Sequence, residues 1–124
     1  MIAVRYFLSH SAPLRVLLLF FATAACAADL CPVNHLSMVT FFDGKPEEQA
    51  SLVYDDIVTT KDGSRATWRL TPDSERGYYL VCTYEKQAKP VTQKLSPKLT
   101  SCVVEYGKPS EKSKLPPVRS VKCR

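Results

Sequence analysis

Two stretches of the sequence decide the fold: Gly77–Glu85, which reads Gly-Tyr-Tyr-Leu-Val-Cys-Thr-Tyr-Glu, and Leu99–Tyr106, which reads Leu-Thr-Ser-Cys-Val-Val-Glu-Tyr. Both are rich in the β-branched and aromatic residues that favour strands. Folded back on each other as an antiparallel pair, they place Cys82 opposite Cys102 on one face, because side chains alternate between the two faces of a strand. We therefore predict a hairpin of these two strands, closed by a Cys82–Cys102 disulfide.

Four other segments have strand composition: residues 35–42, 51–58, 65–71 and 91–95. Pairing of 65–71 with 77–85 puts Trp68 and Leu70 on the face of Cys82, which is therefore the predicted core. Alternation along 35–42 puts one set of side chains on a common face: Leu36, Met38, Thr40 and Phe42. No stretch shows a helical period, so we predict a mainly β domain with a small antiparallel sheet of five to six strands, held by disulfides.

Residues 61–64, Lys-Asp-Gly-Ser, predict a hairpin, because Asp-Gly suits the tight turns that join antiparallel strands. Its register is open. A two-residue loop would pair Ile57 with Trp68, whereas a bulged three-residue loop would pair Val58 with Ala66.

The first 28 residues have the plan of a secretory signal peptide. Residues 1–15 contain Arg5 and Arg15 and no acidic residue. The apolar stretch 16–22 follows, and small residues continue to Ala28. The apolar stretch is too short to cross a bilayer as a helix. We expect cleavage after Ala28 and export to the periplasm.

We thus predict three parts: a signal peptide, 1–28, an antiparallel β domain, 29–106, and a Pro/Lys-rich tail, 107–124. The tail returns to the domain through Cys123. An alternative begins at Cys26, which closes a Thr-Ala-Ala-Cys sequence similar to a bacterial lipoprotein box. Lipid attached there would anchor the protein to a membrane.

Four of the five cysteines remain after cleavage. An even number in a small exported domain is typical of a disulfide framework. With Cys82 paired to Cys102, the remaining pair is Cys31 with Cys123, which would tie the two ends of the domain together. The spacings contain no Cys-x-x-Cys, so the sequence predicts no metal site.

The residues that could do chemistry are few. His35 is the one histidine left after cleavage, and a disulfide at the neighbouring Cys31 removes the thiolate that a Cys-His pair needs. Asp55 and Asp56 are adjacent, so on a strand they point to opposite faces. The formal charge of +5 is spread among interleaved acids and bases. We therefore predict no enzyme, no cofactor, no metal and no nucleic-acid partner.

Binding of a protein partner is the remaining function. Aromatic and charged side chains of the kind found at interfaces are the candidates for it: Asp43, Lys45, Glu47, Glu48, Tyr54, Asp55, Asp56 and Tyr79. Trp68, by contrast, is expected in the core.

The sequence resembles a family of small exported proteins of Gram-negative bacteria, often encoded near type VI secretion genes. The resemblance covers residues 31–106 and rests on Cys31-Pro32, Phe42-Asp43-Gly44-Lys45-Pro46-Glu47-Glu48, Leu52, Trp68, Tyr79-Leu80-Val81-Cys82-Thr83-Tyr84, Gln93-Lys94-Leu95 and Thr100-Ser101-Cys102. The tail with Cys123 departs from the pattern.

This resemblance implies an immunity protein: a periplasmic protein that binds and blocks a secreted, cell-wall-attacking type VI effector. Two alternatives are a periplasmic inhibitor of host lysozyme, whose basic surface would favour an acidic docking patch, and a minor envelope lipoprotein with a structural role.

Overall fold

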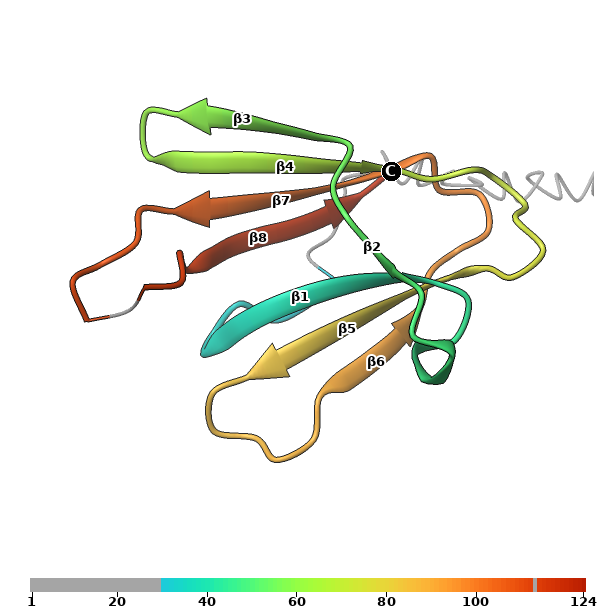
Figure 1. The fold of residues 1–124 in the computed structure, drawn as a ribbon, viewed down its shortest axis with the longest axis horizontal. Helices are drawn as coiled ribbons and strands as arrows, with labels where there is room; N and C mark the ends of the chain where they lie inside the picture. The colour runs from blue at the N-terminus through green and yellow to red at the C-terminus, as the bar shows by residue number, and fades with distance from the viewer. Residues whose placement is uncertain (1–29, 113) are drawn as a thin grey trace, which may run out of the picture.

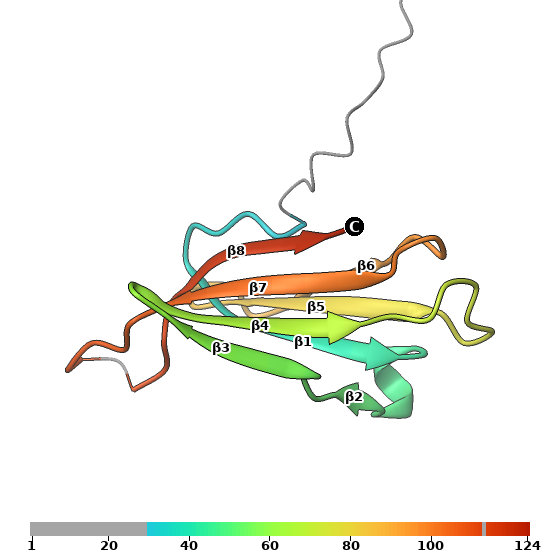
Figure 2. The same cartoon turned by 90° about the horizontal axis from the view of Figure 1, so that it is seen from above.

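The computed structural model describes residues 30–112 and 114–124. The signal peptide of residues 1–28, its cleavage after Ala28 and a lipid on Cys26 lie outside the described residues. Two four-stranded antiparallel sheets pack against each other (Figure 1). Their strands run in nearly the same direction (Figure 2), as in an aligned β-sandwich. The prediction of a mainly β, antiparallel, disulfide-held domain is confirmed, with more strands than expected.

Each sheet collects strands from both halves of the chain. The first sheet has the order β2-β1-β5-β6, with β1 (Leu36–Asp43), β2 (Ser51–Leu52), β5 (Tyr78–Tyr84) and β6 (Val91–Lys94). The second has the order β3-β4-β7-β8, with β3 (Asp56–Thr60), β4 (Gly63–Arg69), β7 (Ser101–Gly107) and β8 (Val118–Cys123). A short 3-10 turn, η1 (Pro46–Glu48), follows β1. The chain thus changes sheets after every second strand.

The predicted hairpin of β5 with β7 is wrong. β5 lies between β1 and β6, whereas β7 lies between β4 and β8. The predicted pairing of β4 with β5 is wrong for the same reason, since Trp68 lies opposite Cys102 on β7. Alternation correctly put Trp68, Cys82 and Cys102 in one core, and all three are buried. They reach it from opposite sheets, because alternation fixes the face of a side chain and not its neighbouring strand.

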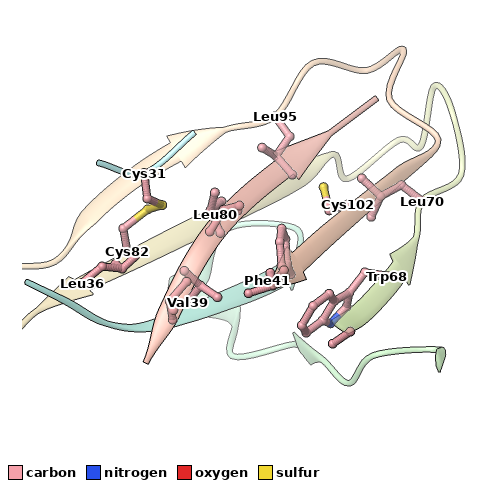
Figure 3. Close-up of a cluster of buried hydrophobic side chains, with 14 of the residues drawn as sticks. Cys31, Leu36, Val39, Phe41, Trp68, Leu70, Leu80, Cys82, Leu95 and Cys102 are labelled. Carbon is pink, nitrogen blue, oxygen red and sulfur yellow. A yellow bond between two sulfur atoms is a disulfide. The ribbon is translucent and has the colours of Figure 1, made fainter. Parts of the chain in front are cut away.

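The disulfides correct the predicted connectivity of Cys82 with Cys102 and of Cys31 with Cys123. The bonds join Cys31 to Cys82 and Cys102 to Cys123; Figure 3 shows the first of them. Cys102 and Cys123 face each other on β7 and β8, with Cα atoms 4.0 Å apart. The backbones of Ser101 and Arg124 exchange N–H···O bonds of 3.1 and 2.9 Å, so the next pair along the ladder is the non-hydrogen-bonded kind that brings side chains closest.

A β-bulge changes the phase of β1. The register with β5 shifts between Leu36 and Met38, and the Ser37 hydroxyl donates to the Thr83 carbonyl at 2.9 Å. Beyond this bulge Val39 and Phe41 point into the core, while Met38 is 50% exposed. The predicted common face of Leu36 with Met38, Thr40 and Phe42 is therefore wrong after its first residue.

The segment 51–58 forms two strands rather than one. β2 belongs to the first sheet and β3 to the second, so the segment between them carries the chain across the sandwich. In the following hairpin Ile57 lies opposite Ala66, and neither predicted register is right. Gly63 belongs to β4, where a Cβ atom would lie 1.9 Å from the Tyr106 carbonyl oxygen. That close approach of strands requires glycine and moves the turn one residue earlier.

The core lies between the sheets and is apolar among the described residues. Phe41 and Trp68 pack against each other in this core with ring centroids 4.6 Å apart (Figure 3). The Trp68 indole N–H donates to the Leu52 carbonyl at 3.2 Å, which satisfies its polar atom. The predicted place of Trp68 in the core is confirmed.

Candidate partner-binding surface

The structure divides the predicted partner-binding residues into two groups. One surrounds the end of β1 and the start of β5: Asp43, Lys45, Glu47, Glu48 and Tyr79. The other lies in the crossover that leads into β3: Tyr54, Asp55 and Asp56. Asp43 and Tyr79 belong to the first sheet and Asp56 to the second, and the other residues lie in the connecting segments. The two groups therefore form two candidate surfaces.

The first group borders the outside of the first sheet, where the two central strands, β1 and β5, carry uncharged side chains and the exposed Lys94 of β6 lies opposite Tyr79. Cross-strand pairs join Phe42 to Tyr79, Thr40 to Val81 and Met38 to Thr83. We call these six residues the neutral face. Along β1 and β5 these residues alternate with the buried core residues. Met38 is exposed and the other five are half-buried. Side chains that pair across strands in this way form a continuous surface.

The outside of the second sheet differs in composition. Arg65, Arg69, Glu105 and Lys122 all lie on it, and the Arg65 Nε lies 2.7 Å from a carboxylate oxygen of Glu105. Charged side chains of this kind are usual where one face of an antiparallel sheet meets water. The neutral face on β1 and β5 lacks them, although Lys94 on the edge strand β6 lies beside it, and depletion of charge is typical of the centre of a protein interface.

The turn after β1 forms a charged rim beside the neutral face. It is fixed by its backbone: the Gly44 N–H donates to the Gly77 carbonyl at 2.7 Å, and the Asp43 N–H donates to Ala50 at 3.0 Å. Gly44 has φ +84°, which favours glycine. Lys45 and Glu47 are exposed on this turn, so a partner on the neutral face would meet them.

An ion pair closes the rim. The Glu48 carboxylate accepts a hydrogen bond from the exposed Arg76 guanidinium. This contact raises the pKa of Arg76, and the nearby Asp43 charge contributes less. The Asp43 Oδ1 atom is buried and has no hydrogen-bond partner among the described residues. Asp43 therefore adds negative potential at the base of the turn rather than a contact on its surface.

The second group borders an apolar hollow of about 280 Å³, which lies where β1, β3 and the tail come together. Tyr54 packs edge-on against Trp68 at 6.1 Å. An Asp55 carboxylate oxygen accepts the Arg69 backbone N–H at 2.6 Å, which fixes the crossover. Side chains from both sheets and the tail line the rest of the hollow, among them Ile57, Tyr106 and Leu115, and Met38 at the end of the neutral face lines it as well. It is large enough for an apolar side chain of a partner.

Sequence reasoning missed most of the neutral face and most of the hollow. Thr40, Phe42 and Val81 become neighbours only when β1 pairs with β5. Ile57 turns toward the hollow because it shares a face with the buried Ala66. Charge depletion along two β-prone segments was the available signal, but it has meaning only once those segments are adjacent.

In residues 30–112 and 114–124, no three His, Cys, Asp or Glu side chains are grouped so that they could hold a metal ion. The described part of the chain also contains no helix long and apolar enough to span a membrane. His35 is exposed at the start of β1, with φ +63°.

A rigid sandwich with an uncharged face and a charged rim has the make-up of a protein-binding domain. Residues 31–124 match the family described as Type VI secretion system Tli immunity protein, and the chain belongs to this family. Comparison with curated proteins and with solved structures finds no match. The predicted resemblance to type VI immunity proteins is confirmed, and the match extends through the tail and Cys123, which the predicted pattern left out.

Proposed function

We propose that this protein is a periplasmic immunity protein that binds a cell-wall-targeting type VI effector and blocks it without any catalysis of its own. Membership of the immunity family supports an effector as the partner. Two disulfides support an oxidising compartment, in agreement with the signal peptide predicted over residues 1–28. In the periplasm the protein would meet an effector on the side from which the wall is attacked.

We assign effector binding to the neutral face, with the turn at Lys45–Glu48 as its rim. The observation that carries this assignment is the contrast between the central strands of the two sheets. On the outside, those of the second sheet carry Arg65, Arg69 and Glu105, whereas Thr40, Tyr79 and Val81 form an uncharged centre on those of the first, with Lys94 of β6 beside Tyr79. Uncharged residues at the centre of an interface exclude water, and charged residues at the rim give orientation and specificity.

The proposed mechanism is occlusion of the effector's active site by a preorganised surface. The Cys31–Cys82 disulfide fixes β5, which carries Tyr79 and Val81, to the start of the domain. The backbone bond from Gly44 to Gly77 fixes the rim to the same strand's entry. A surface that is already ordered loses little conformational entropy on binding, and this favours high affinity.

Capture of the partner tests this proposal. The tagged chain, exported in cells with an active type VI system, is purified from the periplasm, and its bound partner is identified by mass spectrometry. Affinity for that effector is then measured for Val81→Glu and Val103→Glu. Both valines are half-buried on central strands, on the outer faces of the two sheets. Val103→Glu is therefore the matched control for Val81→Glu.

We expect Val81→Glu to lose the effector and Val103→Glu to retain it, because a charge at the centre of an interface must be desolvated. Equal loss of affinity in both variants, or no loss in either, would contradict the assignment. The captured effector is also assayed on peptidoglycan and on phospholipid vesicles, since wall and lipid are both exposed to the periplasm. Wall cleavage supports the proposed target, and lipid cleavage alone would refute that part.

A lysozyme serves as the comparison enzyme. Inhibition of lysozyme together with failure to bind any type VI effector would overturn the proposal in favour of the alternative.

A further inference from the structure

The apolar hollow is an uncovered part of the sandwich interior. Along β4, Ser64 shares a face with the buried Ala66 and Trp68, and Ile57 of β3 lies opposite Ala66. Ile57 and Ser64 therefore lie on the inner face of the second sheet, and both line the hollow. Inner-face positions of a sandwich are usually covered by the opposite sheet, yet Ile57 is 47% exposed.

The length of β2 explains why this place is uncovered. β2 has two residues and pairs with Phe41 and Phe42 of β1, whereas β3 has five residues. After Leu52 the chain leaves the first sheet and crosses to the second (Figure 1). The first sheet thus ends at β1 where the hollow lies, and the side chains of Ser37 and Ser64 are too small to fill the space.

Exposed apolar side chains gather around the hollow. Eight large apolar residues of the described chain are exposed, and half of them line it: Met38, Tyr54, Ile57 and Leu115. Single apolar residues on a surface are ordinary, whereas several around one concave place mark an interaction site. The volume of about 280 Å³ is below the usual range of small-molecule pockets. The hollow therefore suits a protein side chain better than a small-molecule ligand.

Continuity with the neutral face identifies the occupant. Met38 belongs to the neutral face and also lines the hollow. A partner that covers Thr40 and Val81 therefore reaches the hollow across Met38. Membership of the immunity family makes that partner a protein effector.

The chemistry of the hollow limits the kind of side chain that it accepts. Among the described residues, its lining has apolar and hydroxyl groups and no charge. Burial raises the pKa of Tyr106, and the nearby Tyr54 contributes less to this rise. Negative charge is therefore unfavourable in the hollow.

We propose that the effector inserts one bulky, uncharged side chain, aliphatic or aromatic, into the hollow and completes the sandwich core there. This inference rests on the proposed function, because the neutral face brings the effector to the hollow. A residue that fills a pocket of its partner supplies a large share of the binding energy of an interface. The hollow then holds the anchor residue, and the neutral face excludes water beside it.

Affinity for the captured effector tests this inference at two adjacent residues. Ile57 and Val58 are exposed by 47% and 50% on β3. Ile57 lines the hollow, whereas Val58 lies opposite Arg65 on the outer face. The dissociation constant should rise about 100-fold or more in Ile57→Glu, because the new carboxylate must be desolvated. It should change by less than about 3-fold in Val58→Glu. Trp68 fluorescence and far-UV circular dichroism check that both variants are folded.

A second pair of variants leaves every strand unchanged. Leu115 lines the hollow from the tail and is 65% exposed, whereas Val53 is 79% exposed and lies outside the lining. We expect Leu115→Glu to weaken effector binding about 10-fold or more and Val53→Glu to leave it unchanged.

Three outcomes would overturn the inference. Equal affinity in Ile57→Glu and Val58→Glu, with loss of the effector in Val81→Glu, would refute it and leave the proposed function intact. Failure of the wild type to capture any effector would refute both. A wild-type dimer in sedimentation equilibrium that Leu115→Glu dissociates would also refute it, because a second copy would then fill the hollow.

Discussion

Phe41 and Phe42 are adjacent residues with opposite roles, and their replacement by alanine tests the arrangement of the core. Phe41 is fully buried and packs on Trp68 at 4.6 Å. Loss of such a ring costs about 3–5 kcal/mol, with about 0.5–1.5 kcal/mol more for the aromatic pair. Phe42 is half-buried on the outer face beside Tyr79, where the cost is about 1 kcal/mol.

Urea unfolding with the disulfides intact measures both costs, because Trp68 is the single tryptophan and its fluorescence reports on the core. With a denaturant slope of about 2 kcal/mol per molar urea, Phe41→Ala should lower the midpoint by about 2–3 M and Phe42→Ala by about 0.5 M. A larger loss for Phe42→Ala than for Phe41→Ala would refute the bulge, since it would return β1 to the uninterrupted alternation.

Three further outcomes are expected. Gly63→Ala should destabilise the fold by about 1–3 kcal/mol in the same urea assay, because its Cβ would overlap the Tyr106 carbonyl oxygen. Removal of the second disulfide, by Cys102→Ser with Cys123→Ser, should lower the free energy of unfolding by about 3 kcal/mol, as the chain-entropy relation gives for a sequence separation of 21; a non-reducing peptide map that lacks this bond in the wild type would contradict the account. Burial, with a smaller contribution from Tyr54, raises the pKa of Tyr106 above its ordinary value of 10.0. The neutral phenol of Tyr106 therefore stabilises the fold fully below pH 10.0, and this stabilisation is lost as the pH rises through the folded-state pKa. Tyr106→Phe should reduce this alkaline loss of stability, and an unchanged pH profile would count against it.

Local sequence determined which residues of β4, β5 and β7 enter the core but not which strands are neighbours. Leu80, Cys82 and Trp68 were placed correctly, because alternation with period two survives in any sheet arrangement. The connectivity of Cys82 with Cys102 was wrong because two inward-facing cysteines look alike whether they lie on adjacent strands or on opposite sheets. Only the strand order, which depends on long-range packing, separates the two cases.

The binding surface was less predictable than the core. Tyr79 and the turn around Lys45 could be chosen as candidates by residue type. Phe42 could not, because the bulge at Ser37 reverses the phase of β1. That bulge includes a hydrogen bond from Ser37 to Thr83, which is far away in the sequence. No local sequence pattern therefore predicts it.

The central claim is that the neutral face protects a cell by covering an effector. Bacteria that lack their own immunity protein and export wild type, Val81→Glu or Val103→Glu to equal periplasmic levels are challenged with attackers that deliver the effector, and survivors are counted. The account predicts survival with the wild type and Val103→Glu and death with Val81→Glu. Equal survival with both variants would contradict it.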